Sequence, residues 1–273
     1  MTVLETPDSL LSFRQTLSGS VGFVPTMGAL HEGHISLIKK AKAENDHVIV
    51  SVFVNPTQFL AGEDFDRYPR RAEADSSACK KAGVDALFLP ATGTLYASDE
   101  PAVTAPGIRG YILEGKIRPG HFDGVLTIVL KLLNLVSPTN AYFGKKDAQQ
   151  VVLIREMVRR FFLPTQIVPC DTVRDKDGLA LSSRNQYLSS GERQEALKLS
   201  QALRAAAHKI NAGERDCDTI EAVMQLKMEG LAVDYAAITD RDLRDIPQIE
   251  IGNTLLLVAA RVGQTRLIDN FWI

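Results

Sequence analysis

The sequence predicts an α/β protein built on a doubly wound parallel sheet, followed by a smaller α+β domain. Up to about residue 174, short and nearly continuous apolar runs alternate with helix-like segments, a pattern typical of buried strands and crossover helices. The remainder of the chain shows two long helical segments and then three strand-like runs. With 273 residues, of which 45% are hydrophobic, the chain can form a sizeable core.

Strands and helices are expected to alternate in the first part of the chain. Residues 7–17 have the pattern of a short amphipathic helix with Asp8 or Ser9 as its N-cap, and residues 47–54 form a run typical of a buried parallel strand. The expected strands are 21–25, 47–54, 86–90, 140–144 and 166–170, and the expected helices are 7–17, 35–42, 72–82, 125–135 and 149–161.

The pattern changes after residue 174. The expected elements there are helices 190–211 and 216–229, then strands 233–238, 253–260 and 265–269. Helices followed by strands with short turns indicate a smaller α+β domain. We therefore expect two domains, 1–174 and 175–273.

Charge and cysteine content exclude several classes of protein. The net charge of −2 gives no basic excess of the kind that nucleic-acid binders show, so any phosphate should be held by a local site. Cys79, Cys170 and Cys217 form no C-x-x-C pair, which favours reduced thiols over disulfides or a zinc knuckle. Residues 1–17 lack a signal-peptide pattern, and no apolar run is long enough for a membrane span. We expect a cytoplasmic protein that binds neither nucleic acid nor membrane.

Two histidines follow the first buried strand, 21–25. Gly28 and Gly33 allow a ligand to approach the backbone, and a strand that turns into a helix leaves N–H groups that attract anions. His31 and His34 are three residues apart and lie on one face of a helical turn. A phosphate site is therefore indicated, although two solvated surface histidines remain an alternative. A metal site is disfavoured because no third ligand is near.

Two further polar segments come directly after expected strands. Gln58 follows the strand 47–54, and Lys146 with Asp147 follows the strand 140–144. The carboxyl ends of parallel strands form the ligand edge of an open sheet, which favours a functional interpretation. Each segment also has an ordinary alternative, because Gln58 could be a turn residue and Asp147 could cap a helix beside a solvated lysine.

Two loops add basic and hydroxyl groups. Ser182, Ser183 and Arg184 offer hydroxyls and a guanidinium that suit a phosphate, although a capped turn is an equal alternative. Arg118 and His121 lie in a glycine-flanked segment, 114–124, that could act as a mobile lid or be an ordinary surface loop. Together these groups point to a polyphosphate attacked by an external nucleophile, because no side chain stands out as a covalent one.

Five ordered blocks then carry a family resemblance. The run from Pro25 to His34 resembles the HIGH-type signature of the nucleotidylyltransferase superfamily. Together with four further blocks, this run is similar to the family of pantoate–β-alanine ligases (pantothenate synthetases). The four blocks are 53–59, 118–125, 143–150 and 177–185. The last block contains residues 181–184, which would correspond to the KMSKS-like loop of the family. The resemblance spans nearly the whole chain. It implies a Rossmann-like first domain that binds nucleotide and pantoate, and a second domain that closes over the ATP site.

The resemblance also implies a reaction. Members of the family join (R)-pantoate to β-alanine with ATP, release AMP and pyrophosphate, and pass through a bound pantoyl adenylate. The product, pantothenate, is vitamin B5, a precursor of coenzyme A. The implied partners are ATP, (R)-pantoate and β-alanine, with Mg²⁺ carried on the ATP oxygens, no protein metal site and no tightly bound cofactor. A homodimer is implied as well.

The resemblance assigns residues to this chemistry. Gln58 and Gln150 would bind pantoate, with Gln58 also reaching β-alanine, and Arg118 and His121 would cover the active site. The catalytic residues would be His34, His31, Lys146 and Arg184. The ATP-binding residues would be Met27, Gly28, Ala29, Leu30, His31, Glu32, Gly33, His34, Gly144, Lys145, Lys146, Asp147, Val173, Leu181, Ser182, Ser183 and Arg184.

Three positions depart from the family pattern. Lys145 stands where glutamate is usual, and Thr57 and Leu181 stand where methionine is common. None of these changes removes a catalytic group, so we expect them to affect affinity more than chemistry.

Two other functions compete with the ligase. One is a nucleotidylyltransferase that keeps the adenylate as its product, which would need a second anion site. The other is a non-catalytic nucleotide- or RNA-binding module, which the sequence pI near 6.2 disfavours.

Overall fold

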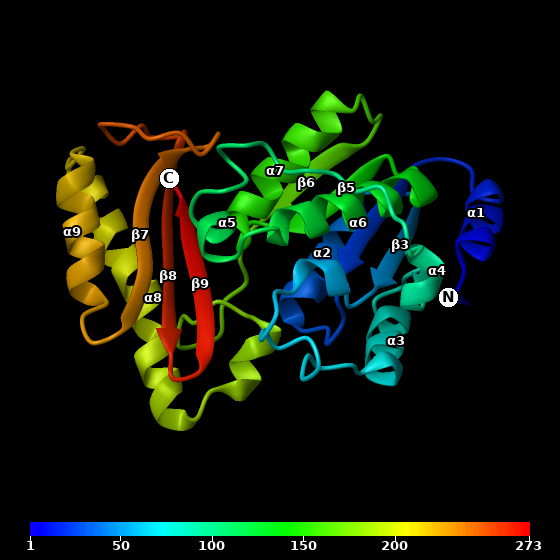
Figure 1. Ribbon diagram of the computed structural model, residues 1–273, viewed down its shortest axis with the longest axis horizontal. Helices are drawn as coiled ribbons and strands as arrows, with labels where there is room; N and C mark the ends of the chain where they lie inside the picture. The colour runs from blue at the N-terminus through cyan, green and yellow to red at the C-terminus, as the bar shows by residue number, and fades with distance from the viewer. The chain divides into compact units, whose positions relative to one another are not determined.

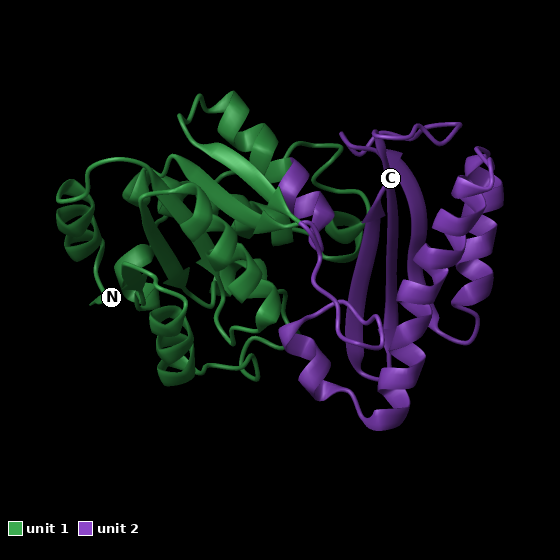
Figure 2. Cartoon of the chain, turned by 180° about the vertical axis from the view of Figure 1, so that it is seen from behind, with its two compact units in different colours: residues 1–144, 153–170 green, residues 145–152, 171–273 purple.

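The computed structural model describes residues 1–273 (Figure 1), which divide into two compact units (Figure 2). Unit 1 consists of residues 1–144 and 153–170, and unit 2 consists of residues 145–152 and 171–273. The division passes through helix α7 (Ala148–Arg160), whose first residues belong to unit 2. The expected separation into domains at residue 174 stays a prediction about how the two parts fold.

Unit 1 contains a parallel sheet of six strands in the order β1-β4-β3-β2-β5-β6. The chain passes from β2 through β3 to β4 on one side of β2 and later adds β5 and β6 on the other side, so the order reverses between β2 and β5. This is the predicted doubly wound sheet, and ligands bind at such reversal points in open α/β folds. The strands are β1 (Thr2–Leu4), β2 (Val21–Thr26), β3 (His47–Val52), β4 (Ala86–Phe88), β5 (Asn140–Gly144) and β6 (Gln166–Cys170).

Helices connect these strands and bury apolar side chains. Val24 and Val50 of the sheet pack in one buried cluster with Leu37 and Ile38 of α2 (Glu32–Glu44), and strand alternation turns Phe23 to the opposite face. None of the chain's helices is both long and apolar enough to span a bilayer. The other helices that lie wholly in unit 1 are α1 (Pro7–Gln15), η1 (Pro56–Gln58), α3 (Ala72–Lys81), α4 (Thr92–Leu95), α5 (Glu114–Ile117) and α6 (His121–Val136).

Capping decides where the first two helices begin. The N-cap of α1 is Thr6, whose hydroxyl accepts a hydrogen bond from the Ser9 N–H while Ser9 bonds back to Thr6. The predicted caps, Asp8 and Ser9, are therefore wrong, because they lie inside the first turn of the helix. Helix α2 starts at Glu32, three residues before its predicted start, because His31 caps it with its imidazole.

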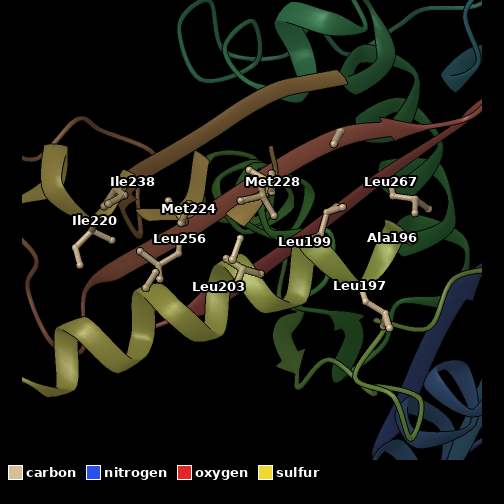
Figure 3. Packing of buried hydrophobic residues seen from close by; sticks show 14 of the residues in the cluster. Ala196, Leu197, Leu199, Leu203, Ile220, Met224, Met228, Ile238, Leu256 and Leu267 are labelled. Atoms are coloured by element: carbon tan, nitrogen blue, oxygen red, sulfur yellow. The ribbon is translucent and has the colours of Figure 1, made fainter. Parts of the chain in front are cut away.

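Unit 2 contains the smaller α+β arrangement of helices and antiparallel strands that the sequence predicts after the parallel sheet. Its antiparallel sheet has the order β7-β8-β9, with β7 (Ala232–Asp240), β8 (Thr254–Val262) and β9 (Thr265–Trp272). Helices α8 (Ser190–Asn211) and α9 (Cys217–Lys227) follow the short helix η2 (Ser183–Tyr187). Apolar side chains of both long helices, such as Leu203 and Met224, pack with Leu256 of the sheet and form a separate core (Figure 3).

Candidate active site

The loop between β2 and α2 places two histidines together at the helix start. His31 is the N-cap, and its Nδ1 accepts a hydrogen bond from the Gly33 N–H at 3.2 Å. His34 returns the contact, because its Nδ1 accepts from the His31 N–H at 3.3 Å. The two rings lie 4.1 Å apart between centroids. The sequence pattern thus becomes a capping box in which both side chains are imidazoles.

These hydrogen bonds decide which ring nitrogen carries the proton. A backbone N–H can only donate, so Nδ1 of His31 and Nδ1 of His34 both act as acceptors. In a neutral imidazole the proton then resides on Nε2. Both histidines are therefore hydrogen-bond donors through Nε2, which is the form that can bind a phosphate oxygen.

Asp75 of α3 fixes the residues that precede His31. Its carboxylate, on a residue only 2% exposed, accepts from the N–H of Ala29 at 2.9 Å and the N–H of Leu30 at 2.8 Å. Ala29 adopts a left-handed conformation with φ of 49°. Gly28 must be glycine, because a Cβ there would lie 2.9 Å from the Asp75 carboxylate. The N–H groups expected to attract an anion are thus partly occupied by a carboxylate of the chain itself.

Gln58 lies in the short helix η1, directly after β3, and its side-chain amide is held on both sides. The Gln58 Nε2 donates to the Met27 sulfur at 2.8 Å, and its Oε1 accepts from Asn55 Nδ2 at 3.1 Å. Asn55 is buried, and Tyr96 donates to its Oδ1 at 2.8 Å. The structure therefore brings together Met27 and Gln58, two predicted site residues that are 31 positions apart.

Arg118 and His121 hold the backbone of Gln58. The Gln58 carbonyl accepts hydrogen bonds from an Arg118 Nη at 3.2 Å and from His121 Nδ1 at 2.7 Å. Arg118 also forms a two-pronged ion pair with Glu63, with both distances at 2.6 Å. The expected irregular loop over 114–124 is wrong, because α5 occupies its first part and α6 begins at His121.

Burial sets the charge of His121. Desolvation, aided by the positive charge of Arg118, lowers the pKa of His121 to about 4. The ring is then neutral, its Nδ1 carries the proton, and its Nε2 accepts from Arg118 at 3.1 Å. Burial alone would raise the pKa of Glu63, but the hydrogen bond and charge of Arg118 outweigh it and hold this pKa below its usual value.

Gly124 lets α6 approach this cluster. A Cβ at this position would lie 2.3 Å from the Thr57 carbonyl oxygen and 2.8 Å from the Gln58 nitrogen. The Gly124 carbonyl in turn accepts from Asn55 Nδ2 at 3.1 Å. Gln58 can therefore occupy its position only because Gly124 of α6 has no side chain.

In unit 2, a small hairpin brings two predicted ATP-binding residues together. The Leu181 N–H donates to the Val173 carbonyl at 3.0 Å, and Arg174 pairs with Ala180. Ser182 then caps η2 by accepting from the Arg184 N–H at 3.3 Å. Residues 182–184 thus form the capped turn that was one of the two alternatives for this segment, and their role at a phosphate stays a prediction.

The two adjacent lysines after β5 have different surroundings. Lys145 forms an ion pair with Asp171 at 2.6 Å, and its ammonium lies 5.5 Å from the centre of the Trp272 ring. The Lys146 ammonium is 3.8 Å from the carboxylate of Asp147, and the Lys146 side chain is 19% exposed. The ammonium of Lys145 is therefore neutralised by a nearby carboxylate, whereas Lys146 has only a distant contact with one.

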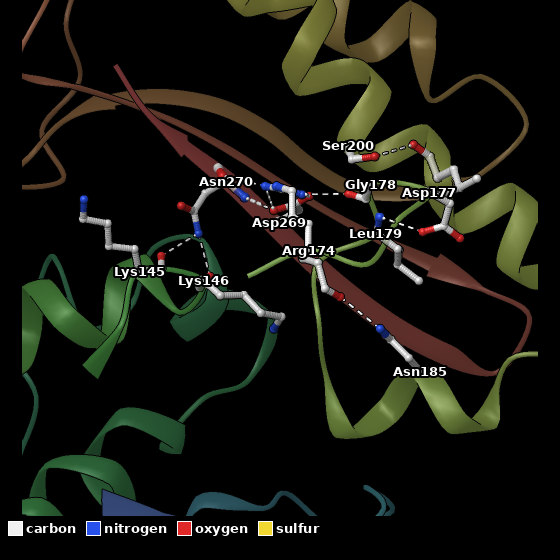
Figure 4. Close-up of polar contacts among 12 residues, drawn as sticks. Lys145, Lys146, Arg174, Asp177, Gly178, Leu179, Asn185, Ser200, Asp269 and Asn270 are labelled. Carbon is white, nitrogen blue, oxygen red and sulfur yellow. Dashed lines mark hydrogen bonds and ion pairs between the residues drawn. The ribbon is translucent and has the colours of Figure 1, made fainter. Parts of the chain in front are cut away.

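Several residues of this arrangement were not identified from the sequence. Asp75 reads as an ordinary acidic residue in a first helical turn, and Glu63 as part of a solvated acidic loop. Asn55 could have been identified from the sequence, because it stands between a buried strand and a proline, where the ligand edge of the sheet is expected. Asn270, whose amide bonds to the backbone of Lys145 and Lys146 (Figure 4), follows no recognisable pattern.

The other predicted residues lie where their elements place them. Glu32 and Gly33 form the first turn of α2, Gly144 ends β5, and Gln150 is half-buried in the first turn of α7. No group of three or more His, Cys, Asp or Glu side chains is arranged to hold a metal ion.

Sequence comparisons agree on one family. The model of the pantoate–β-alanine ligase family matches residues 2–272. The chain is 56% identical to the pantothenate synthetase of Aliarcobacter butzleri over 273 residues, which is 100% of both chains.

Solved structures give the same result. The pantothenate synthetase of Thermus thermophilus aligns with a TM-score of 0.95 at 41% identity, covering 100% of this chain and 99% of that one. The pantoate–β-alanine ligase of Francisella tularensis, in complex with beta-gamma ATP and β-alanine, aligns with a TM-score of 0.83 at 39% identity, covering 100% of this chain and 97% of that one.

Proposed function

The chain belongs to the pantoate–β-alanine ligase family, and from this premise we propose that it condenses (R)-pantoate with β-alanine at the expense of ATP. In the first half-reaction a pantoate carboxylate oxygen attacks the α-phosphorus, pyrophosphate leaves, and pantoyl adenylate forms. In the second, the β-alanine amine attacks the acyl carbon, AMP leaves, and pantothenate forms. The ligase of Francisella tularensis, described in complex with beta-gamma ATP and β-alanine, supports this choice of substrates.

The observation that carries the proposal is the pair of imidazoles at the start of α2, whose Nδ1 atoms both accept backbone hydrogen bonds and so leave the proton to Nε2. Charge builds up on the phosphate oxygens as pyrophosphate departs, and donors fixed in advance stabilise that charge without reorganising. His31 and His34 meet this requirement because backbone hydrogen bonds hold both rings. We assign the transition-state contact to His34 and a supporting contact to His31.

The remaining family assignments complete the proposal. Lys146 and Arg184 would add positive charge on the phosphates. The other nucleotide contacts would come from residues 27–33, 144–147, 173 and 181–183, with Mg²⁺ entering on the ATP oxygens. Asp75 already occupies the N–H groups of Ala29 and Leu30, so in the segment 27–34 the histidines would supply the principal donors.

Gln58 and Gln150 are proposed to bind pantoate. The Gln58 amide is oriented by Asn55 and Met27 and keeps a second Nε2 hydrogen for a ligand oxygen. The resemblance gave Arg118 and His121 a covering role, which stays a prediction. Their contacts with the Gln58 carbonyl support a holding role, because they fix the residue proposed to bind pantoate and β-alanine.

Product analysis tests the reaction. AMP and pantothenate should form only when ATP, (R)-pantoate and β-alanine are all present. A stable adenylate released as the final product would instead favour a nucleotidylyltransferase.

Histidine substitution tests the site. His34→Ala should lower the rate of pantothenate formation roughly a hundredfold or more, the usual scale for removing a transition-state donor. His208→Ala, an exposed histidine of α8, is the matched control and should leave the rate unchanged. Unimpaired synthesis by the His34→Ala enzyme would show that the site is wrongly assigned.

Two further statements are proposals of the same kind. The resemblance to the family supports a homodimer, which sedimentation velocity would measure. The buried cysteines Cys79, Cys170 and Cys217 form no disulfide and are compatible with the reducing conditions of the cytoplasm, where we propose that the enzyme acts.

A further inference from the structure

Asn270 of β9 bonds to the backbone of Lys145 and Lys146, the two residues of the lysine turn that precedes α7. Its side-chain Nδ2 donates to the Lys145 carbonyl at 2.9 Å and to the Lys146 carbonyl at 2.6 Å (Figure 4). Asn270 is only 4% exposed. One buried amide group therefore fixes two consecutive peptide units, and the Lys146 side chain leaves the chain at the Cα atom that joins them.

The orientation of this amide is fixed by those two contacts. Its Oδ1 is buried and has no hydrogen-bond partner. Rotating the amide by half a turn would place Oδ1 against the carbonyl oxygens of Lys145 and Lys146, which are acceptors and would repel it. The side chain thus keeps both bonds to the lysine turn even though its own oxygen is left unsatisfied.

An ion pair holds the backbone of Asn270 in place. Arg174 binds the Asp269 carboxylate with two hydrogen bonds, at 2.7 and 2.8 Å, and the Asp269 side chain is only 3% exposed. The Asp269 carboxylate also accepts from the Asn270 N–H at 2.8 Å. The donor that contacts the lysine turn is therefore itself supported by a buried and fully paired group.

The turn separates the roles of the two lysines. The Lys145 carbonyl accepts a second hydrogen bond, from Trp272 Nε1 at 3.4 Å, and the Lys145 ammonium is paired with Asp171. The Lys146 ammonium lies 3.8 Å from its nearest carboxylate, at the limit of an ion pair. Fixing the backbone at this point determines the direction in which the Lys146 side chain leaves the turn.

We propose that Asn270 is a positioning residue for Lys146, acting through the two carbonyl hydrogen bonds. It touches no substrate itself. The inference rests on the proposed function, which gives Lys146 its contact with the ATP phosphates, and it adds a specific task for the C-terminal strand.

A double-mutant cycle tests the proposal. Asn270→Ala should lower kcat for adenylate formation at least tenfold, measured as pyrophosphate release with saturating ATP and pantoate. In a Lys146→Ala background the same substitution should change the rate less than about threefold, because the group it positions is already gone. Asn253→Ala, an exposed asparagine in the turn before β8, is the control and should leave the rate unchanged.

The conservative variant Asn270→Ser keeps one donor and should recover part of the loss. It also serves as the test protein if Asn270→Ala does not fold, as judged by circular dichroism. An equal fold-loss in both backgrounds would mean that Asn270 is merely structural and would overturn the proposal, as would an unimpaired Asn270→Ala enzyme. If Lys146→Ala itself retained full activity, the role of Lys146 in the proposed function would fail, and the positioning role would fail with it.

Discussion

The backbone contacts of single side chains determine most of the chemistry that we propose. His31 and His34 become donors through Nε2 because two backbone N–H groups occupy their Nδ1 atoms. Asp75 holds the loop before them, and Ala29 accepts a left-handed backbone there. Peptide groups thus orient both histidines, whose rings also lie 4.1 Å apart between centroids.

Protonation of His121 should make stability depend on pH. Its folded pKa of about 4 lies below the value of 6.5 for an exposed histidine, so the unfolded chain binds the extra proton between these values. The free energy of unfolding is therefore at its full value above pH 6.5 and decreases as the pH falls toward 4. The decrease between pH 7 and pH 5 should be about 2 kcal/mol.

Urea unfolding at several pH values measures this effect. His121→Asn keeps a donor for the Gln58 carbonyl but cannot titrate, so its free energy of unfolding should fall by about 2 kcal/mol less than that of the parent between pH 7 and pH 5. His208→Asn, at an exposed position, should follow the parent. Parallel curves for the parent and His121→Asn would contradict the assignment of a neutral, buried imidazole.

At the scale of elements, the close packing of α6 on η1 positions Gln58. The Gly124 backbone lies directly on the Thr57 carbonyl and leaves no room for a methyl group. Arg118, between α5 and α6, and His121, at the start of α6, then reach the Gln58 carbonyl. The segment 114–124, for which the sequence allowed a mobile lid or a surface loop, therefore contains α5 and the start of α6, and Arg118 and His121 in it bond to the residue proposed to bind pantoate.

Gly124→Ala tests this packing. The added methyl must push α6 away from η1, which should lower the free energy of unfolding by about 1–3 kcal/mol. It should also raise KM for pantoate about tenfold or more, because a binding group is displaced.

Gly191→Ala is the matched control. Gly191 lies in the first turn of α8 with no atom within 4 Å of an added Cβ, so alanine should be tolerated or slightly stabilising. An unchanged KM for pantoate in Gly124→Ala would mean that the packing of α6 does not control Gln58.

At the scale of the whole molecule, each compact unit has its own core. The apolar face of α8 and α9 packs on the antiparallel sheet in unit 2, and a separate cluster joins α2 to the parallel sheet in unit 1. Two cores in one chain allow the two units to differ in stability, which is the basis of the predicted division into domains.

Leu203→Ala should destabilise unit 2 selectively. Leu203 is fully buried in that core, so its truncation should cost about 2–5 kcal/mol, whereas Leu226→Ala, at a position 69% exposed, should cost little. Hydrogen exchange should accelerate for amides of α8 and β8 and stay slow for those of β2 and β3. Equal acceleration in both units would show that the chain unfolds as a single cooperative domain.

The sequence by itself determined the order and type of nearly all elements and the position of the HIGH-type turn. These features depend on residues close together in the chain: the buried run of β3, the apolar face of α8, and the glycines around His31 and His34. Only the three-residue strand β1 and short helices such as α4 and α5 were missed, because segments of three or four residues carry too little periodicity to be recognised.

The tertiary structure alone decided how the candidate site residues are held. Asp75 reaches Leu30 across 45 positions, Arg118 reaches Glu63 across 55, and Asn270 reaches Lys146 across 124. No local pattern specifies such partners, because each contact requires the chain to return to the same point after one or more crossovers. Local sequence thus determined which groups the chain carries to the edge of its sheet, and long-range packing determined their direction, protonation and support.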